Sequence, residues 1–163
     1  LAAFGDQTRS PYGGVLGGIT MHAGLSFPGR RPVRAHVRID GSWHGGRHEV
    51  GKGGTRFTAS VHALRLHVTP ALHLRAGRFG LVLGPTGGLL VALRFPSEGI
   101  GPAAPHLVTW EAGLLVEPSI SITDRLAISL GAAATATGAN LSSEEPQTLV
   151  VYGQVHGGLT WTY

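Results

Sequence analysis

Apolar and polar residues alternate along most of this chain. From Val33 to Trp43 the alternation is unbroken, with apolar side chains on one face and ionic or polar side chains on the other. A period of two places successive side chains on opposite faces of a β-strand. No segment has the spacing of an amphipathic helix, and no apolar run reaches the roughly 18 residues of a membrane helix. The pattern therefore predicts an all-β protein.

Seven segments carry the alternation clearly, and they cover residues 12–27, 33–43, 56–68, 72–83, 106–123, 126–137 and 149–163. Turn-forming residues predict short turns at 28–32, 69–71 and 123–125. Long loops are predicted at 44–55, 84–105 and 138–148. The alternation changes phase near Ala63, which predicts a β-bulge, and residues 1–11 are predicted to be irregular.

The last segment has one apolar face and ends on aromatic residues. It resembles the closing strand of bacterial outer-membrane β-barrels, whose terminal aromatic residue is read by the assembly machinery. The alternation of short and long connections is typical of periplasmic turns and extracellular loops. Aromatic residues at strand ends predict two girdles, one at each membrane interface. One girdle comprises Trp43, Phe57 and Trp110, and the other comprises Phe27, Trp161 and Tyr163.

These features make the chain similar to the small OmpA-type barrels of bacterial outer membranes. The resemblance implies one domain, residues 1–163, folded as an antiparallel up-and-down transmembrane β-barrel of about eight strands. Single-chain bacterial barrels have even strand numbers, so one strand is missing from the seven. It is expected upstream of Leu1, with the first strand truncated; otherwise residues 89–95 span the membrane or a partner chain completes the wall. The start at Leu1, without Met or a signal segment, is expected of a processed exported protein.

Composition narrows the choice further. Charged residues make up only 13% of the chain and glycine contributes 26 residues, which does not suit the charged surface of a soluble domain. Cysteine is absent, so there is no disulfide and no thiolate metal site. The 13 basic residues are scattered rather than gathered on one face, which disfavours nucleic-acid binding. Periodicity alone leaves open a soluble barrel with its apolar face turned inward around a ligand.

The polar faces of the strands carry charged residues that a narrow barrel would bring together. Unpaired, each would be costly to bury, whereas paired they would fill the lumen as a plug. The predicted lumen charge network comprises Arg34, Arg38, Asp40, Arg75, Glu111 and Glu117. The histidines predicted to face inward are His22, His36, His44, His62, His73 and His156. They lack the spacing of metal ligands, so no metal or cofactor is predicted.

A catalytic alternative rests on residues 19–23, which are similar to the segment bearing the catalytic His of the lipid A palmitoyltransferases. His22, Asp40 and Ser42 contain the groups of a Ser-His-carboxylate site. That family also has an adjacent Asp-Ser pair, and here Gly41 intervenes. The His and Ser pattern of the lipid A deacylases fails, because Gly158 stands two residues after His156.

The sequence therefore favours a non-catalytic outer-membrane barrel that serves as a structural, anchoring or surface-recognition component, alone or within a larger envelope assembly. Its expected partners are outer-membrane lipid, a protein of such an assembly, and lipopolysaccharide, whose phosphates would meet Arg47, Lys52 and Arg56. The alternatives are a narrow pore, a lipid A-modifying enzyme and a soluble ligand-binding barrel.

Overall fold

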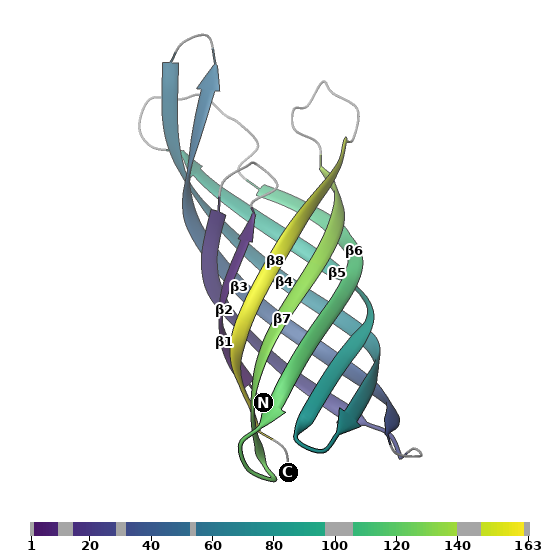
Figure 1. Cartoon of the computed structure of the whole chain (residues 1–163). Helices are drawn as coiled ribbons and strands as arrows, with labels where there is room; N and C mark the ends of the chain where they lie inside the picture. The colour runs from purple at the N-terminus through teal and green to yellow at the C-terminus, as the bar shows by residue number, and fades with distance from the viewer. Residues whose placement is uncertain are drawn as a thin grey trace.

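The computed structural model describes residues 2–9, 15–28, 32–52, 55–96, 106–139 and 148–161, with side chains described for 16–28, 32–47, 60–93, 95, 108–138 and 149–161. These residues form eight antiparallel strands in one closed barrel (Figure 1). The strands are β1 (Ala2–Arg9), β2 (Val15–Ser26), β3 (Val33–Lys52), β4 (Thr55–Ala76), β5 (Phe79–Pro96), β6 (His106–Ser121), β7 (Leu126–Ala139) and β8 (Thr148–Trp161). The predicted all-β, up-and-down barrel is confirmed.

The eighth strand is β1, from a segment predicted to be irregular. It pairs with β2 from Ala2↔His22 to Arg9↔Val15 and with β8 from Ala2↔Thr160 to Thr8↔Gln154. The expectation of a missing strand upstream of Leu1 is therefore wrong, as is the assignment of 1–11 as irregular. Apolar alternation is weak in AAFGDQTR, and pairing on both sides compensates for it.

Strand β4 runs straight through the predicted turn at Thr69, Pro70 and Ala71. The chain reverses instead at Gly77, whose φ of 60° suits a residue without a Cβ. The β4–β5 ladder is interrupted only between Val68↔Gly87 and Leu72↔Leu83, where the register sets Pro70 opposite Pro85. Neither proline has an N–H to donate, so the sequence signal of a turn marks a local gap in the ladder.

Residues 89–95, predicted to lie in a long loop, belong to β5. They pair with β4 on one side and with β6 on the other. This stretch is apolar on successive residues, from Leu89 to Leu93, so period-two alternation is absent there. Its inward side chains, Leu90 and Ala92, are apolar because they lie in the apolar part of the lumen.

The predicted loop at 44–55 is also wrong. Pairing between β3 and β4 continues without a break from Val33↔Leu74 to Lys52↔Thr55. The pairing of β3 with β2 ends at Gly45, and that of β4 with β5 ends at Ala59. Beyond these points the β3–β4 hairpin has no other described strand beside it and projects past the barrel rim (Figure 1).

The same unbroken register excludes the predicted bulge at Ala63. Val61 and Ala63 both point inward and are fully buried, whereas His62 points outward. Outward His62 stacks on Trp43, with ring centroids 5.7 Å apart. The change of phase in the hydropathy pattern therefore reflects an apolar stretch of lumen rather than an inserted residue.

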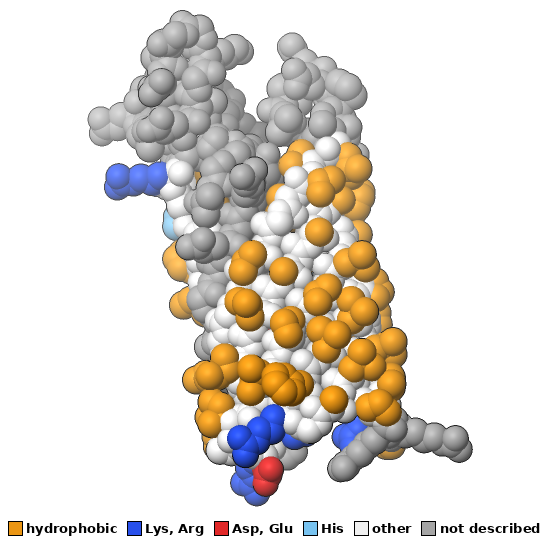
Figure 2. Space-filling model, viewed as in Figure 1, with side chains coloured by type: hydrophobic (Ala, Val, Ile, Leu, Met, Phe, Trp, Pro, Cys, Tyr) orange, Lys and Arg blue, Asp and Glu red, His pale blue; other side chains and the backbone are white. Residues whose placement is uncertain are grey.

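The barrel is apolar outside and polar inside. Among the described side chains, 28 large apolar residues are exposed, and buried polar or charged residues outnumber buried apolar ones by 17 to 7. Figure 2 shows apolar side chains over the wall and charged ones at its ends. This polarity is the reverse of a soluble ligand-binding barrel and suits a wall in contact with lipid. No described helix is long and apolar enough to cross a membrane.

The described girdle residues lie on the outer face. Trp43 and Trp110 are half-exposed toward the long-loop end, and Phe27 and Trp161 are half-exposed at the short-turn end. Phe79 and Phe95 add exposed rings at the two ends. The side chains of Phe57 and Tyr163 lie outside the described residues.

A wall facing lipid predicts a depth-dependent cost for cations on its outer face. Leu114 lies mid-strand in β6, and Leu149 lies at the long-loop end of β8, with exposures of 60% and 62%. We expect Leu114→Arg to lower the free energy of unfolding in lipid vesicles by about 2–4 kcal/mol and Leu149→Arg by no more than about 1 kcal/mol. Urea titration in vesicles measures both. Equal, small losses would contradict a membrane-spanning wall.

Candidate functional site in the barrel lumen

The lumen holds two groups of paired charges. The first, the Glu117 cluster, comprises Arg38, Asp40, Glu117 and His156. Arg38 Nε donates to Asp40 Oδ1 at 2.5 Å, and Arg38 Nη1 donates to Glu117 Oε2 at 2.5 Å. His156 Nε2 lies 2.8 Å from the same Glu117 oxygen. Because Arg38 is on β3, Glu117 on β6 and His156 on β8, these bonds cross the lumen between strands that are not neighbours.

The second group, the Glu111 cluster, comprises His44, Arg65, His67 and Glu111. Arg65 Nε donates to Glu111 Oε1 at 3.3 Å, and His67 Nε2 lies 2.6 Å from Glu111 Oε2. Arg65 Nη1 is 2.9 Å from His44 Nδ1. The guanidinium also lies over the ring of Tyr152, 5.3 Å from its centroid, and thus reaches across the barrel from β4 to β8.

Each carboxylate in these clusters has a cationic or imidazole partner, as burial demands. Arg38 and Glu111 are 2% exposed and Glu117 is 4% exposed. An isolated charge at such a position would cost several kcal/mol, so the pairs are conditions of folding rather than additions to it. Two guanidinium groups face three carboxylates, so a proton carried by His67 or His156 would balance the charge.

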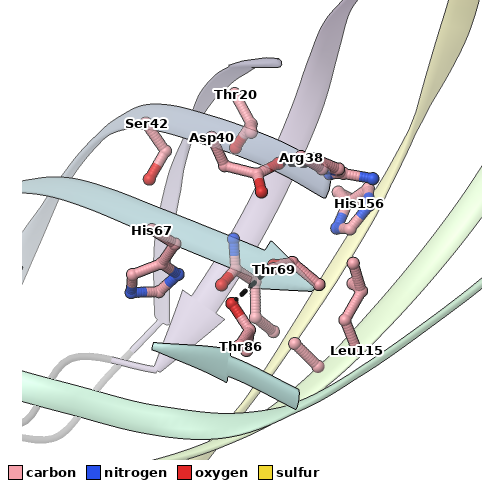
Figure 3. Close-up of a pocket in the computed structure, with 11 residues that line it drawn as sticks. Thr20, Arg38, Asp40, Ser42, His67, Thr69, Thr86, Leu115 and His156 are labelled. Atoms are coloured by element: carbon pink, nitrogen blue, oxygen red, sulfur yellow. Dashed lines mark hydrogen bonds and ion pairs between the residues drawn. The ribbon is translucent and has the colours of Figure 1, made fainter. Parts of the chain in front are cut away.

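Little space is left between the clusters. A cavity of about 20 Å³ is lined by groups that include Asp40, Ser42, His67, Thr69 and Thr86 (Figure 3). That volume suits one water molecule. Thr69 Oγ1 donates to Thr86 Oγ1 at 2.8 Å and joins β4 to β5 where the proline pair interrupts the ladder.

Toward the long-loop end the lumen becomes apolar. Its packed layer is formed by Leu16, Val61, Ala63, Leu90 and Ala92, all at most 1% exposed. The layer comes from β2, β4 and β5 and lies beyond the Glu111 cluster. Ion pairs and this apolar layer together fill the described lumen.

The six residues of the predicted charge network lie in three places. Arg38, Asp40 and Glu117 meet in one cluster, and Glu111 lies in the other. Arg34 and Arg75 have the inward phase, but they lie at the short-turn end of their strands and are exposed. The alternation therefore gave the correct face for these two residues but not their depth.

Arg65 and His67 are the two members of the Glu111 cluster absent from the predicted charge network and histidine set. A sequence signal existed, since both alternate with Leu64, Leu66 and Val68. Among the histidines predicted to face inward, His62 is on the outer face, and the prediction for it is wrong. No group of three or more His, Asp or Glu side chains is placed to hold a metal ion among the described residues.

The catalytic candidates lie side by side on one wall of the lumen. The register sets His22 opposite Asp40, and Thr20 opposite Ser42. His22 and Asp40 are at most 9% exposed, and the carboxylate of Asp40 is held by Arg38. The cavity beside Asp40 and Ser42 has no room for an acyl chain or a sugar.

Comparison with known proteins places this architecture in a fold class. No protein-family model and no curated protein matches the chain. Two solved structures share its fold. One is Neisserial surface protein A (NspA), at a TM-score of 0.56 and 13% identity over 99% of this chain and 94% of that one. The other is the outer membrane enzyme PagL, at 0.55 and 6% identity over 99% and 100%. The chain has the fold of the small outer-membrane β-barrels.

The two clusters predict distinct couplings in mutant cycles. Asp40→Asn and Glu117→Gln each remove a charged partner of Arg38, and each is expected to cost about 1–3 kcal/mol of unfolding free energy. Because they share one guanidinium, the double variant should depart from additivity by more than about 0.5 kcal/mol.

The control pairs Glu117→Gln with Glu111→Gln, which have no partner in common among the described contacts. This double variant should be additive to within about 0.5 kcal/mol by urea unfolding. Comparable coupling in both cycles would mean that the lumen holds one network and that the division into two clusters is wrong.

Proposed function

We propose that this chain is a non-catalytic barrel of the bacterial outer membrane that acts as a membrane-embedded structural and surface-recognition component. The observation that carries the proposal is the filled lumen, with paired charges over much of its length and an apolar layer beyond them. A barrel sealed in this way offers its ends and its lipid-facing wall for function. A narrow pore has no water-filled path through the described lumen, where the cavity holds about one water.

The β3–β4 hairpin is the natural recognition element. It extends past the last pairs of its neighbours at Gly45 and Ala59. Arg47 is exposed at the base of this projection. Lys52 and Arg56 lie by register near its far end, in the pairs Lys52↔Thr55 and Gly51↔Arg56. Three cations along one ribbon beyond the membrane suit a polyanionic surface, and the phosphates of lipopolysaccharide are the anions found there.

An enzymatic role has weaker support. PagL is an enzyme by its title, but a shared fold at 6% identity carries no activity with it. The candidate groups His22, Asp40 and Ser42 line a wall without space for a lipid substrate. NspA is a surface protein by its title, which is compatible with the proposed role.

Charge reversal tests the recognition part of the proposal. The triple variant Arg47→Glu, Lys52→Glu, Arg56→Glu should lose affinity for vesicles containing lipopolysaccharide by about two orders of magnitude, at about 1 kcal/mol for each cation near an anionic surface. Arg78→Glu with Arg125→Glu is the control, because both arginines are exposed at the opposite, short-turn end. Binding is measured by co-sedimentation at low and high salt with barrels oriented in nanodiscs. Unchanged binding of the triple variant would refute lipopolysaccharide recognition by the hairpin.

Planar-bilayer recording tests the sealed lumen. The folded wild-type barrel is expected to give no discrete conductance steps, because ion pairs and packed side chains occupy the lumen. A general porin serves as the positive control in the same bilayers. Reproducible single-channel steps would replace the structural role with that of a pore.

A further inference from the structure

The short-turn mouth of the barrel carries a cluster that the lumen plug does not use. Its members are Ser26 on β2, Arg34 and His36 on β3, and His73 and Arg75 on β4; we call it the basic mouth cluster. All five have the inward phase, yet they lie at the strand ends nearest the turns. Arg34, Arg75 and Ser26 are exposed, and the two histidines are half-buried. The cluster is therefore open to solvent.

Cross-strand register holds these groups together. Ser26 lies directly opposite His36, with 3.0 Å between Ser26 Oγ and His36 Nδ1. Arg34 lies directly opposite His73. The rings of His36 and His73 meet edge to face, with centroids 6.1 Å apart. Arg75 Nε donates to Gly77 O at 3.3 Å, which holds that guanidinium beside the turn while using only one of its donors.

Two glycines make room for this arrangement. A Cβ at Gly24 would lie 2.6 Å from His36 Nε2, so the ring occupies the space of the missing side chain. A Cβ at Gly80 would lie 2.5 Å from Ser119 Oγ and 3.3 Å from His73 Nε2. Imidazole and hydroxyl groups thus line a recess on β2 and β5 that a larger residue would fill.

The electrostatics of the mouth are uncompensated. The charged groups that act most strongly on His73 are Arg75 and Arg34, followed by Glu117. His36 is influenced by His73, Arg38 and Glu117. Glu117 is already bonded to Arg38 and His156. Neighbouring like charges on one face of a sheet are unfavourable, so an anion at the mouth would relieve their repulsion.

We propose that the basic mouth cluster is a binding site for a phosphoryl group. Guanidinium forks match phosphate oxygens in geometry, and imidazole N–H and Ser hydroxyl groups supply further donors. The group is either inorganic phosphate or the phosphodiester of an anionic phospholipid at the adjacent membrane surface. A divalent metal is disfavoured, because two fixed cations flank the histidines and Ser26 engages His36 Nδ1. The site lies at the opposite end from the β3–β4 hairpin and is independent of lipopolysaccharide recognition.

The first experiment titrates inorganic phosphate into the barrel folded in maltoside detergent, followed by calorimetry and by the ring resonances of His36 and His73. Saturable binding is expected, weakened about tenfold by Arg34→Gln or Arg75→Gln, since each removes a charge-assisted bond. Gly80→Ala should weaken binding without any change of charge, because its methyl group meets His73 and Ser119. Heat-modifiable gel migration verifies that each variant is folded.

Arg125→Gln is the matched control, since Arg125 is exposed on the β6–β7 turn at the same end. A second arm uses nanodiscs of phosphatidylethanolamine with or without phosphatidylglycerol and counts retained lipids by native mass spectrometry. Phosphate binding that depends on Arg34 and Arg75 supports a free-phosphate site, and selective retention of phosphatidylglycerol with the same dependence supports a headgroup site. The proposal is overturned by binding in neither arm, or by equal weakening in Arg125→Gln.

Discussion

The structure depends on one constraint, which is that backbone N–H and C=O groups in contact with lipid must find partners within the protein. β1 meets that demand by pairing with β2 and β8 at once, which closes the sheet and leaves no edge within the barrel wall. The cost of an exception is visible at Pro70 and Pro85, which face each other so that one gap in the ladder accommodates both residues without a donor. A hydroxyl bond from Thr69 to Thr86 joins the strands beside it.

Closure at eight strands makes the lumen narrow, and narrowness decides its chemistry. Side chains from strands that are not neighbours come within bonding distance, so Arg38 reaches Glu117 and Arg65 lies over Tyr152. Charges buried at such density persist only when paired. From the short-turn end to the long-loop end, the described lumen passes from an open basic mouth through two paired clusters to an apolar layer.

This gradient separates the tasks of the molecule. The paired clusters and the apolar layer hold the wall together and occupy the space that a solute would need. Unpaired positive charge is found instead at the two ends, with Arg34 and Arg75 at the short-turn mouth and Arg47 at the base of the projecting hairpin. Both ends meet membrane surfaces where phosphate groups concentrate, so the arrangement links charge placement to partners outside the barrel.

The sequence alone determined the fold class, the outward face of most strands and the polarity of the wall, because a period of two records which side chains face lipid. It also identified Arg38, Asp40 and Glu117 as inward charges. Tertiary structure decided the rest. Strand β1 exists through its two neighbours, Thr69 and Pro70 continue a strand that neighbouring β3 supports, and Val61 points inward to an apolar layer assembled from three strands. Which charges meet depends on register and depth around the closed barrel, and alternation along a single strand carries no information about either.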